Sequence, residues 1–280
     1  MMLQVNTKQK TGKSKMKKNK DKEFDKYELY INSVQSPETD VKFLRRVYKE
    51  LRDKKPETMR EDFCGTFALS CEWVKLKKDH KAIGVDLDEE PISYGKEHYF
   101  SQLTDEQKGR VEILTANVLD PKLPKADIVQ AQNFSYFIFK KREELRDYYK
   151  NALKGLKSDG IFVVDCFGGS QCFEPNEEET EHKGYSYFWD QDSFDPVTNE
   201  AQFYIHFKRK GEKKREKVFS YDWRMWSIPE VREIMLEAGF KDTAVYWEGT
   251  DEDGEGDGEF TRVTKGEDCE SWVAYIVGLK

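Results

Sequence analysis

The chain has 280 residues, of which 37% are hydrophobic, 36% charged and 14% aromatic. This length suffices for one large domain with a buried core, and so many aromatic residues exclude a wholly disordered chain. The sequence contains neither a run of about twenty apolar residues nor the apolar core of a signal peptide, so we expect a cytoplasmic protein that makes no use of a membrane.

The cysteines and histidines form neither a disulfide framework nor a metal site. The five cysteines are odd in number and scattered, and the four histidines do not lie at metal-ligand spacing from them. We therefore expect free thiols in a reducing compartment and no metal ion. The cysteines are Cys64, Cys71, Cys166, Cys172 and Cys269.

Charge is distributed unevenly between the N-terminal segment and the rest. Residues 1–22 contain eight lysines and one aspartate, about +7 in sum, so residues 23–280 sum to about −14 in a chain of net charge −7. An acidic body does not resemble a nucleic-acid-binding surface, which needs clustered Lys and Arg. Residues 1–22 lack hydrophobic periodicity and are predicted to be a disordered tail, either simply solvated or docked on RNA or an anionic membrane.

Two amphipathic helices are predicted in residues 23–56, the second starting at Pro37 after Ser36. Residues 57–168 then alternate between short apolar runs and longer helical stretches. Such alternation is typical of a parallel sheet covered on both faces by helices. Strands are predicted at residues 59–63, 82–86, 111–116, 127–132 and 161–166, and helices at 68–76, 90–100 and 143–156.

Residues 169–224 follow a different pattern, with aromatic or alternating runs joined by turn sequences. They predict an antiparallel β insertion with strands at 185–189, 201–208 and 217–223, interpreted as a substrate lid. Residues 225–280 are expected to return to the core, with a helix at 228–238 and strands at 243–247 and 272–277. The acidic residues 251–257 are expected to form a solvated loop. The fold class is therefore α/β, a doubly wound, seven-stranded, mostly parallel sheet with an antiparallel insertion after the fifth strand.

The turn after the first strand, residues 61–67, is the first candidate site. Gly65 lets the backbone approach a ligand closely, and free N–H groups at the following helix start attract polar groups. Asp86 ends the second strand, where an acid can accept hydrogen bonds from both hydroxyls of a ribose. Gly65 and Thr66 alone are a weak signal, but together with Asp86 in a βαβ context they predict a nucleotide-like cofactor.

On these residues the chain resembles the class I (Rossmann-like) S-adenosylmethionine-dependent methyltransferases, over residues 57–166 and more loosely beyond. The first motif of that family is an acid at the strand end followed by Gly-Cys-Gly-Thr-Gly. Cys64, Gly65 and Thr66 match it directly, whereas Phe63 and Phe67 replace the outer glycines. The later segments are similar to uncharacterised bacterial members of the class. The resemblance implies S-adenosylmethionine as the cofactor.

The resemblance also implies a role for individual residues. Glu61 matches the motif acid near the methionine moiety, Asp86 the ribose-binding acid, and Leu87 would flank the adenine. Asn117, followed by Val118, would contact the adenine amino group. The exit of the fourth strand would lie beside the transferred methyl group, and a tyrosine of the first helix would cover the cofactor. The residues in these last two places are Asn133, Phe134, Ser135 and Tyr30.

Several of these residues have a purely structural alternative. Cys64 suits a small buried position, Asn117 a turn, Phe134 the core and Tyr30 ordinary helix packing. The aromatic residues of the insertion permit a cage for a cationic amine, but alternating aromatics on a half-buried sheet more often simply pack. The cage candidates are Tyr185, Tyr187, Phe188, Trp189, Tyr221, Trp223 and Trp226.

The predicted activity is in-line methyl transfer to a small-molecule acceptor. Such a reaction needs alignment and exclusion of water more than a particular catalytic side chain, and no residue is singled out as catalytic; His182 and His206 are candidates only if a base is needed. Two alternatives stay open: an RNA or protein methyltransferase anchored by the lysine-rich tail, and a catalytically silent binding module whose two phenylalanines block the site. A dehydrogenase would need a G-x-G-x-x-G turn, which the first strand lacks. The sequence singles out neither a particular methyl acceptor nor an oligomeric state.

Overall fold

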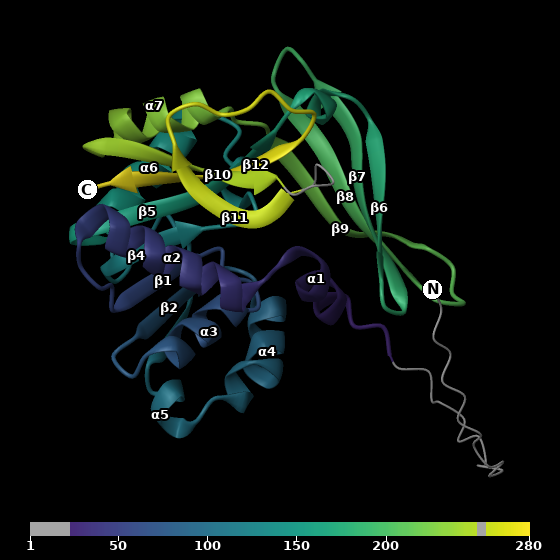
Figure 1. Cartoon of the computed structure of the whole chain (residues 1–280). Helices are drawn as coiled ribbons and strands as arrows, with labels where there is room; N and C mark the ends of the chain where they lie inside the picture. Colours follow the sequence, from purple (N-terminus) through teal and green to yellow (C-terminus); the bar gives the residue numbers. More distant parts are fainter. Residues whose placement is uncertain (1–22, 251–255) are drawn as a thin grey trace, which may run out of the picture.

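The computed structural model describes residues 23–250 and 256–280, so the predicted tail and most of the predicted acidic loop lie outside it. Its core is an eight-stranded sheet with the strand order β11-β10-β12-β5-β4-β1-β2-β3 (Figure 1). Strands β1 to β5 are parallel, and β12 pairs antiparallel with β5. The strands are β1 (Thr58–Asp62), β2 (Lys81–Asp86), β3 (Val111–Thr115), β4 (Ala126–Ala131), β5 (Leu156–Gly168), β10 (Asp242–Thr250), β11 (Gly256–Val263) and β12 (Trp272–Leu279).

Helices cover both faces of this sheet, as Figure 1 shows. One face packs against α2 and α3 through Val47 and Trp73, and the other against α6 and α7 through Tyr148 and Met235. The predicted doubly wound α/β class is confirmed. Not one helix in the described part of the chain has the length and apolar character needed to cross a membrane. The helices are α1 (Lys26–Val34), α2 (Pro37–Arg52), α3 (Ala68–Leu76), α4 (Glu89–His98), α5 (Asp105–Lys108), α6 (Arg142–Lys154) and α7 (Ile228–Ala238).

A second, four-stranded antiparallel sheet follows β5, as the sequence predicts. Its strands run in the order β6-β7-β8-β9. Helix α1 packs on this sheet, where Leu29 joins Ile205 and Phe207 in a small apolar cluster. The strands are β6 (Asn176–His182), β7 (Tyr185–Asp195), β8 (Glu200–Arg209) and β9 (Arg215–Arg224).

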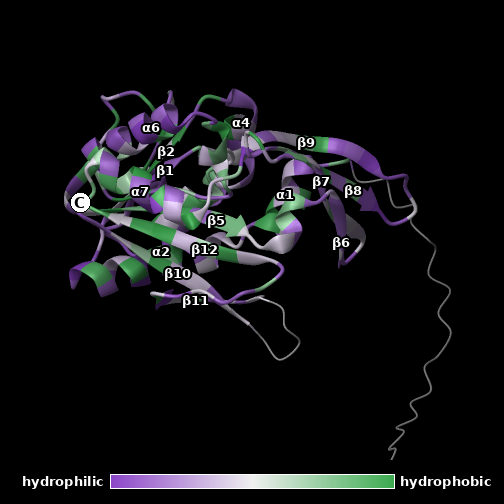
Figure 2. Ribbon diagram, turned by 90° about the horizontal axis from the view of Figure 1, so that it is seen from above, coloured by the Kyte–Doolittle hydropathy of each residue, from purple (hydrophilic) through white to green (hydrophobic). Residues whose placement is uncertain are grey.

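Two strands, β6 and β11, were not predicted, and both lie at sheet edges. Residues 176–181 of β6 are all exposed, and most of β11 is exposed too, so neither shows the alternation of apolar and polar residues by which a strand is recognised. Figure 2 shows the contrast between the hydrophobic β5 and β12 in the middle of the molecule and the more hydrophilic β11 outside them. The prediction of seven strands is therefore wrong by one, and part of the predicted acidic loop is strand.

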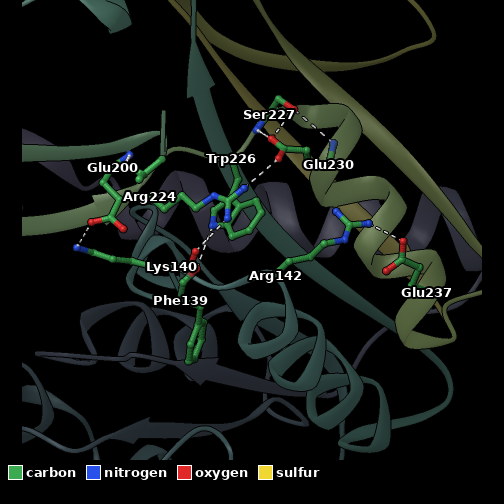
Figure 3. A network of polar contacts seen from close by, with 10 residues as sticks. Phe139, Lys140, Arg142, Glu200, Arg224, Trp226, Ser227, Glu230 and Glu237 are labelled. Carbon is green, nitrogen blue, oxygen red and sulfur yellow. Dashed lines mark hydrogen bonds and ion pairs between the residues drawn. The ribbon is translucent and has the colours of Figure 1, made fainter. Parts of the chain in front are cut away.

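A polar network ties the end of the second sheet to the core (Figure 3). The Arg224 guanidinium donates to the Lys140 carbonyl at 3.1 Å, and the Trp226 indole N–H donates to the Phe139 carbonyl at 3.2 Å. The Ser227 side chain caps α7 by a reciprocal capping box with Glu230. These contacts fix the position of β9 relative to the exit of β4.

All five cysteines are free, and four of them are buried, in agreement with the expected free thiols.

Candidate active site

The candidate site is a cavity of about 220 Å³ at the carboxyl ends of β1 and β4. Ligands in open α/β sheets bind at this edge. Helix α1 and strand β9 lie on its outer side, so both sheets contribute to it (Figure 1). The lining residues are Tyr27, Tyr30, Gln35, Asp40, Glu61, Asp62, Phe63, Cys64, Gly65, Thr66, Leu69, Asp88, Pro91, Gln130, Gln132, Asn133, Ser135, Phe219 and Tyr221.

The turn after β1 keeps a left-handed backbone although two glycines of the motif are absent. Phe63, Gly65 and Phe67 have φ of 59°, 50° and 45°. For a non-glycine residue this region costs about 1–2 kcal/mol, so other contacts must hold the phenylalanines there. The Phe63 ring packs edge-on against Tyr148, and Phe67 is completely buried outside the cavity lining. Phe67 therefore does not reach the cavity, whereas Phe63 forms part of its wall.

Two glycines determine the space around this turn. A Cβ atom on Gly65 would meet nothing within 4 Å, so the turn faces open space there. A Cβ atom on Gly95 of α4 would lie 2.1 Å from the Thr66 carbonyl oxygen. Helix α4 therefore packs directly on the turn, at a contact that sequence reasoning missed.

We expect Gly95→Ala to displace the turn and lower stability by about 1–3 kcal/mol, because the added methyl group overlaps a backbone oxygen. Urea unfolding measures the change. Gly109→Ala is the matched control, since its Cβ would contact the Asp105 and Glu106 carbonyl oxygens at an ordinary 3.6 Å. Equal stability of the two variants would contradict the close packing of α4 on the turn.

Asp86 is joined to the turn by a hydrogen bond. One carboxylate oxygen accepts from the Gly65 N–H at 2.7 Å, and the other accepts from the Asp88 N–H at 2.9 Å. The adjoining Leu87 is 64% exposed. Each carboxylate oxygen has a second lone pair, so this half-buried group can still accept from a ligand.

The segment after β3 lies outside the cavity lining. The exposed Asn117 accepts a hydrogen bond from the Leu119 N–H at 2.9 Å, and Val118 is buried in the core. Asn117 thus forms the turn that the sequence allowed as its structural alternative. Contact of either residue with an adenine stays a prediction.

The exit of β4 is held by an acid that sequence reasoning missed. Asn133 and Phe134 both have φ of 57°, and their N–H groups donate to the Asp165 carboxylate at 2.6 and 2.9 Å. Burial raises the pKa of Asp165 to about 7, although these bonds act in the opposite direction. Asn133 and Ser135 line the cavity, whereas the half-buried Phe134 ring packs against Phe167 at the edge of the core.

Glu61 lines the cavity and joins β1 to α3. Its carboxylate accepts from the Ser70 N–H at 2.9 Å and from the Ser70 hydroxyl at 2.5 Å. Burial raises the pKa of Glu61 to about 8. Its neighbour Asp62 forms a buried ion pair with Arg60 at 2.8 Å.

The outer wall of the cavity is aromatic. Tyr27 and Tyr30 come from α1, and Phe219 and Tyr221 come from β9. The Tyr221 hydroxyl lies in a hydrogen bond with Tyr30, and burial raises the pKa of Tyr30 to about 12. Of the seven aromatic residues proposed for a cage, Tyr221 alone lines the cavity, while Trp223 and Trp226 are core residues. Most of that predicted cage is therefore packing.

One histidine cluster outside the cavity brings together Glu177, Asp190 and His206. The His206 Nδ1 atom accepts from the Lys217 N–H at 2.7 Å, so Nε2 must hold the ring proton, and it faces Asp190 at 2.9 Å. A protonated Nε2 is a donor and not a metal ligand. His206 thus stabilises the second sheet, and it does not line the cavity.

No protein-family model and no curated protein matches the sequence. Solved structures do match. An S-adenosylmethionine-dependent methyltransferase from Clostridium acetobutylicum shares 18% identity over 90% of this chain and 97% of its own, with a TM-score of 0.64. A sugar N-methyltransferase from Streptoalloteichus shares 16% identity over 100% and 99%, with a TM-score of 0.61. An amino pentose methyltransferase from Micromonospora echinaspora, solved with S-adenosylmethionine bound, shares 12% identity over 90% and 97%, with a TM-score of 0.62.

These likenesses extend over 90–100% of the chain. The chain therefore has the fold of the class I S-adenosylmethionine-dependent methyltransferases, in agreement with the resemblance of its motifs. At such low identity the likeness establishes the fold, and function must be argued from the site.

Proposed function

We propose that the protein is an S-adenosylmethionine-dependent methyltransferase that acts on a small molecule. The observation that favours this most is the cavity at the carboxyl ends of β1 and β4, bounded by the Gly65 turn and closed outside by α1 and β9. A neighbour of the same fold is solved with S-adenosylmethionine bound, and another is described as a sugar N-methyltransferase, which is a small-molecule activity.

The chain offers groups that fit the cofactor. Gly65 faces open space, the Asp86 carboxylate has free acceptor capacity, and the exposed Leu87 can cover an apolar ring face. We assign cofactor binding to the residues that the resemblance implies, with Val118 acting from the core and Phe134 from its edge. They are Glu61, Phe63, Cys64, Gly65, Thr66, Asp86, Leu87, Asn117, Val118, Asn133, Phe134, Ser135 and Tyr30.

Methyl transfer requires of the protein mainly that it position the two reactants. The cofactor supplies a methyl group on a sulfonium, whose neutral thioether is a good leaving group. The residues of the turn and of the β4 exit would hold the reactants in line, and the aromatic wall of α1 and β9 would exclude water. The second sheet would then act as the lid over an acceptor site, within the insertion at residues 169–224.

The RNA or protein methyltransferase alternative rests on residues 1–22, which lie outside the described structure. The acidic lining of the cavity does not suit a phosphate backbone. That alternative predicts salt-sensitive polynucleotide binding that disappears when residues 1–22 are deleted.

Calorimetric titration with S-adenosylhomocysteine tests the proposal. We expect wild type to bind, and Asp86→Ala to bind roughly 10- to 100-fold more weakly, because hydrogen bonds to a charged group are lost. The control is Asp192→Ala, which removes an exposed acid of the second sheet. No binding by wild type would refute the proposed function, whereas equal affinity of Asp86→Ala and wild type would refute only the ribose role of Asp86.

A further inference from the structure

The cavity has a one-sided charge. Its lining includes the carboxyl groups of Asp40, Glu61, Asp62 and Asp88. Among residues 23–250 and 256–280, those that line it include no lysine, arginine or histidine. Glu61, with its pKa raised to about 8, and Asp62, paired with Arg60, add little negative charge at neutral pH, so the charge of this cleft comes from Asp40 and Asp88. Such a cleft attracts a cation and repels an anion.

Three of these four acids already have partners within the protein. Glu61 accepts from Ser70, Asp62 pairs with Arg60, and the Asp88 carboxylate accepts from the Glu90 N–H at 2.9 Å. The carboxyl groups of Glu61, Asp62 and Asp88 therefore each stabilise the protein without any ligand.

Asp40, near the start of α2, differs from them. Its carboxylate takes a backbone hydrogen bond from Ser36, and no ion pair to it forms within the described part of the chain. Burial raises the pKa of Asp40 to about 6. Its charge also raises the pKa values of Glu61 and Asp165, so it lies within electrostatic reach of the ends of both β1 and β5. A positive ligand group would supply the partner that the protein does not.

Gln130 points independently to a ligand that donates hydrogen bonds. This residue of β4 lines the cavity and is 2% exposed, and its side-chain oxygen has no hydrogen-bond partner in the structure as described. A buried acceptor left unpaired costs about 1–3 kcal/mol. A ligand N–H group that donates to the Gln130 side-chain oxygen would remove this cost.

The aromatic wall suits the same kind of ligand. The Tyr30 and Phe219 rings lie 5.0 Å apart between centroids, with the Tyr221 hydroxyl beside them. Ring faces attract ammonium groups. The wall already attracts one such group of the protein itself: the Lys26 ammonium lies 4.8 Å from the centre of the Tyr27 ring and 5.8 Å from that of Phe219, and both rings line the cavity.

We propose that the methyl acceptor is an amine, bound as its ammonium form by Asp40 with Gln130 and the Tyr30–Tyr221 wall, so that the enzyme is an N-methyltransferase. This inference rests on the proposed function. Before transfer the ammonium gives one proton to the Asp40 carboxylate. The lone pair of the neutral amine then forms the new N–C bond to the methyl group, while the C–S bond breaks and its electron pair stays on sulfur. The methylated ammonium and S-adenosylhomocysteine are the products.

Calorimetry on the full chain saturated with S-adenosylhomocysteine tests this with three matched pairs: cyclohexylamine and cyclohexanol, 2-phenylethylamine and 2-phenylethanol, glucosamine and glucose. We expect at least one amine to bind more than about tenfold tighter than its alcohol at pH 7.5, because the alcohol cannot form the charged bond. Asp40→Asn should abolish this preference. Asp147→Asn, which changes the same charge on α6 outside the cavity lining, should keep it.

Three results would overturn the inference. The first is an equal affinity for each alcohol and its matched amine. The second is no measurable binding of any amine, and the third is a preference for amines that persists in Asp40→Asn. A variant Asp40→Asn that binds S-adenosylhomocysteine itself more weakly would assign Asp40 to the cofactor instead, which also overturns it. Failure of S-adenosylhomocysteine to bind wild type would count against the proposed function, and the amine titrations can then be repeated on the free protein.

Discussion

Arg60→Met is expected to lower the free energy of unfolding by about 3–5 kcal/mol, the usual cost of removing one partner of a buried ion pair. Arg60 and Asp62 are both fully buried on β1, and two guanidinium nitrogens contact the two carboxylate oxygens at 2.8 and 3.1 Å. Tyr148 donates a further hydrogen bond to the same carboxylate at 3.0 Å. Without Arg60 the Asp62 carboxyl group would have to stay buried uncompensated or take up a proton.

The packing around Arg60 is adapted to its guanidinium group. Gly155 leaves room for the guanidinium, since a Cβ atom there would lie 2.3 Å from one of its nitrogens. Urea unfolding at pH 7 measures the loss. Arg142→Met is the control, because its ion pair with Glu237 is partly exposed at the surface and should contribute only about 0–1 kcal/mol. Similar losses in the two variants would contradict a buried pair on β1.

Phe67→Ala is expected to destabilise the protein by about 3–5 kcal/mol, because it leaves a cavity beneath the turn of residues 61–67. The Phe67 ring is completely buried and packs edge-on against Phe100. The backbone φ of 45° is as unfavourable for alanine as for phenylalanine. The substitution therefore removes the ring without relieving the backbone strain.

Phe67→Gly separates the ring from the backbone. Glycine adopts a left-handed conformation without the steric cost, so we expect Phe67→Gly to be about 1 kcal/mol more stable than Phe67→Ala. At most helical positions glycine is instead the less stable of the two. Both variants are compared by urea unfolding, and a Phe67→Gly protein less stable than Phe67→Ala would show that residue 67 is not left-handed.

The sequence predicts the strands that contain apolar or alternating runs and misses two exposed edge strands that contain neither. Strands such as β4 and β5 contain apolar runs because helices cover both of their faces. Strand β6 has the sequence NEEETEH, and only its backbone pairing with β7 makes it a strand. Such pairing depends on a partner elsewhere in the chain and leaves no local pattern. The extra edge strand β11 was missed for the same reason.

The residues of the candidate site also fall into those with a local sequence signal and those without one. The turn with Gly65 is local in sequence and has a recognisable motif, so it was found together with Asp86 at its expected spacing. Asp40, Gln130 and Phe219 come from three distant segments, and only the topology brings them to one cavity. Asp165 did leave a signal, since an acid inside the apolar run of residues 161–167 needs a buried partner.

The replacement of two motif glycines by Phe63 and Phe67 shows where sequence reasoning about a turn is weakest. From the sequence, the two phenylalanines suggested that the geometry of this loop could change or that they could block the cofactor site. The structure keeps the left-handed backbone at both positions and buries the Phe67 ring away from the cavity. Tertiary packing here overrides a local conformational preference.

A crystal structure grown with S-adenosylhomocysteine would test the central claim most directly. The bound molecule should lie in the cavity at the carboxyl ends of β1 and β4, along the Gly65 turn and with its ribose hydroxyls on the Asp86 carboxylate. Density for S-adenosylhomocysteine elsewhere on the protein, or an empty cavity in crystals grown at saturating ligand, would contradict the assignment of this cavity as the cofactor site.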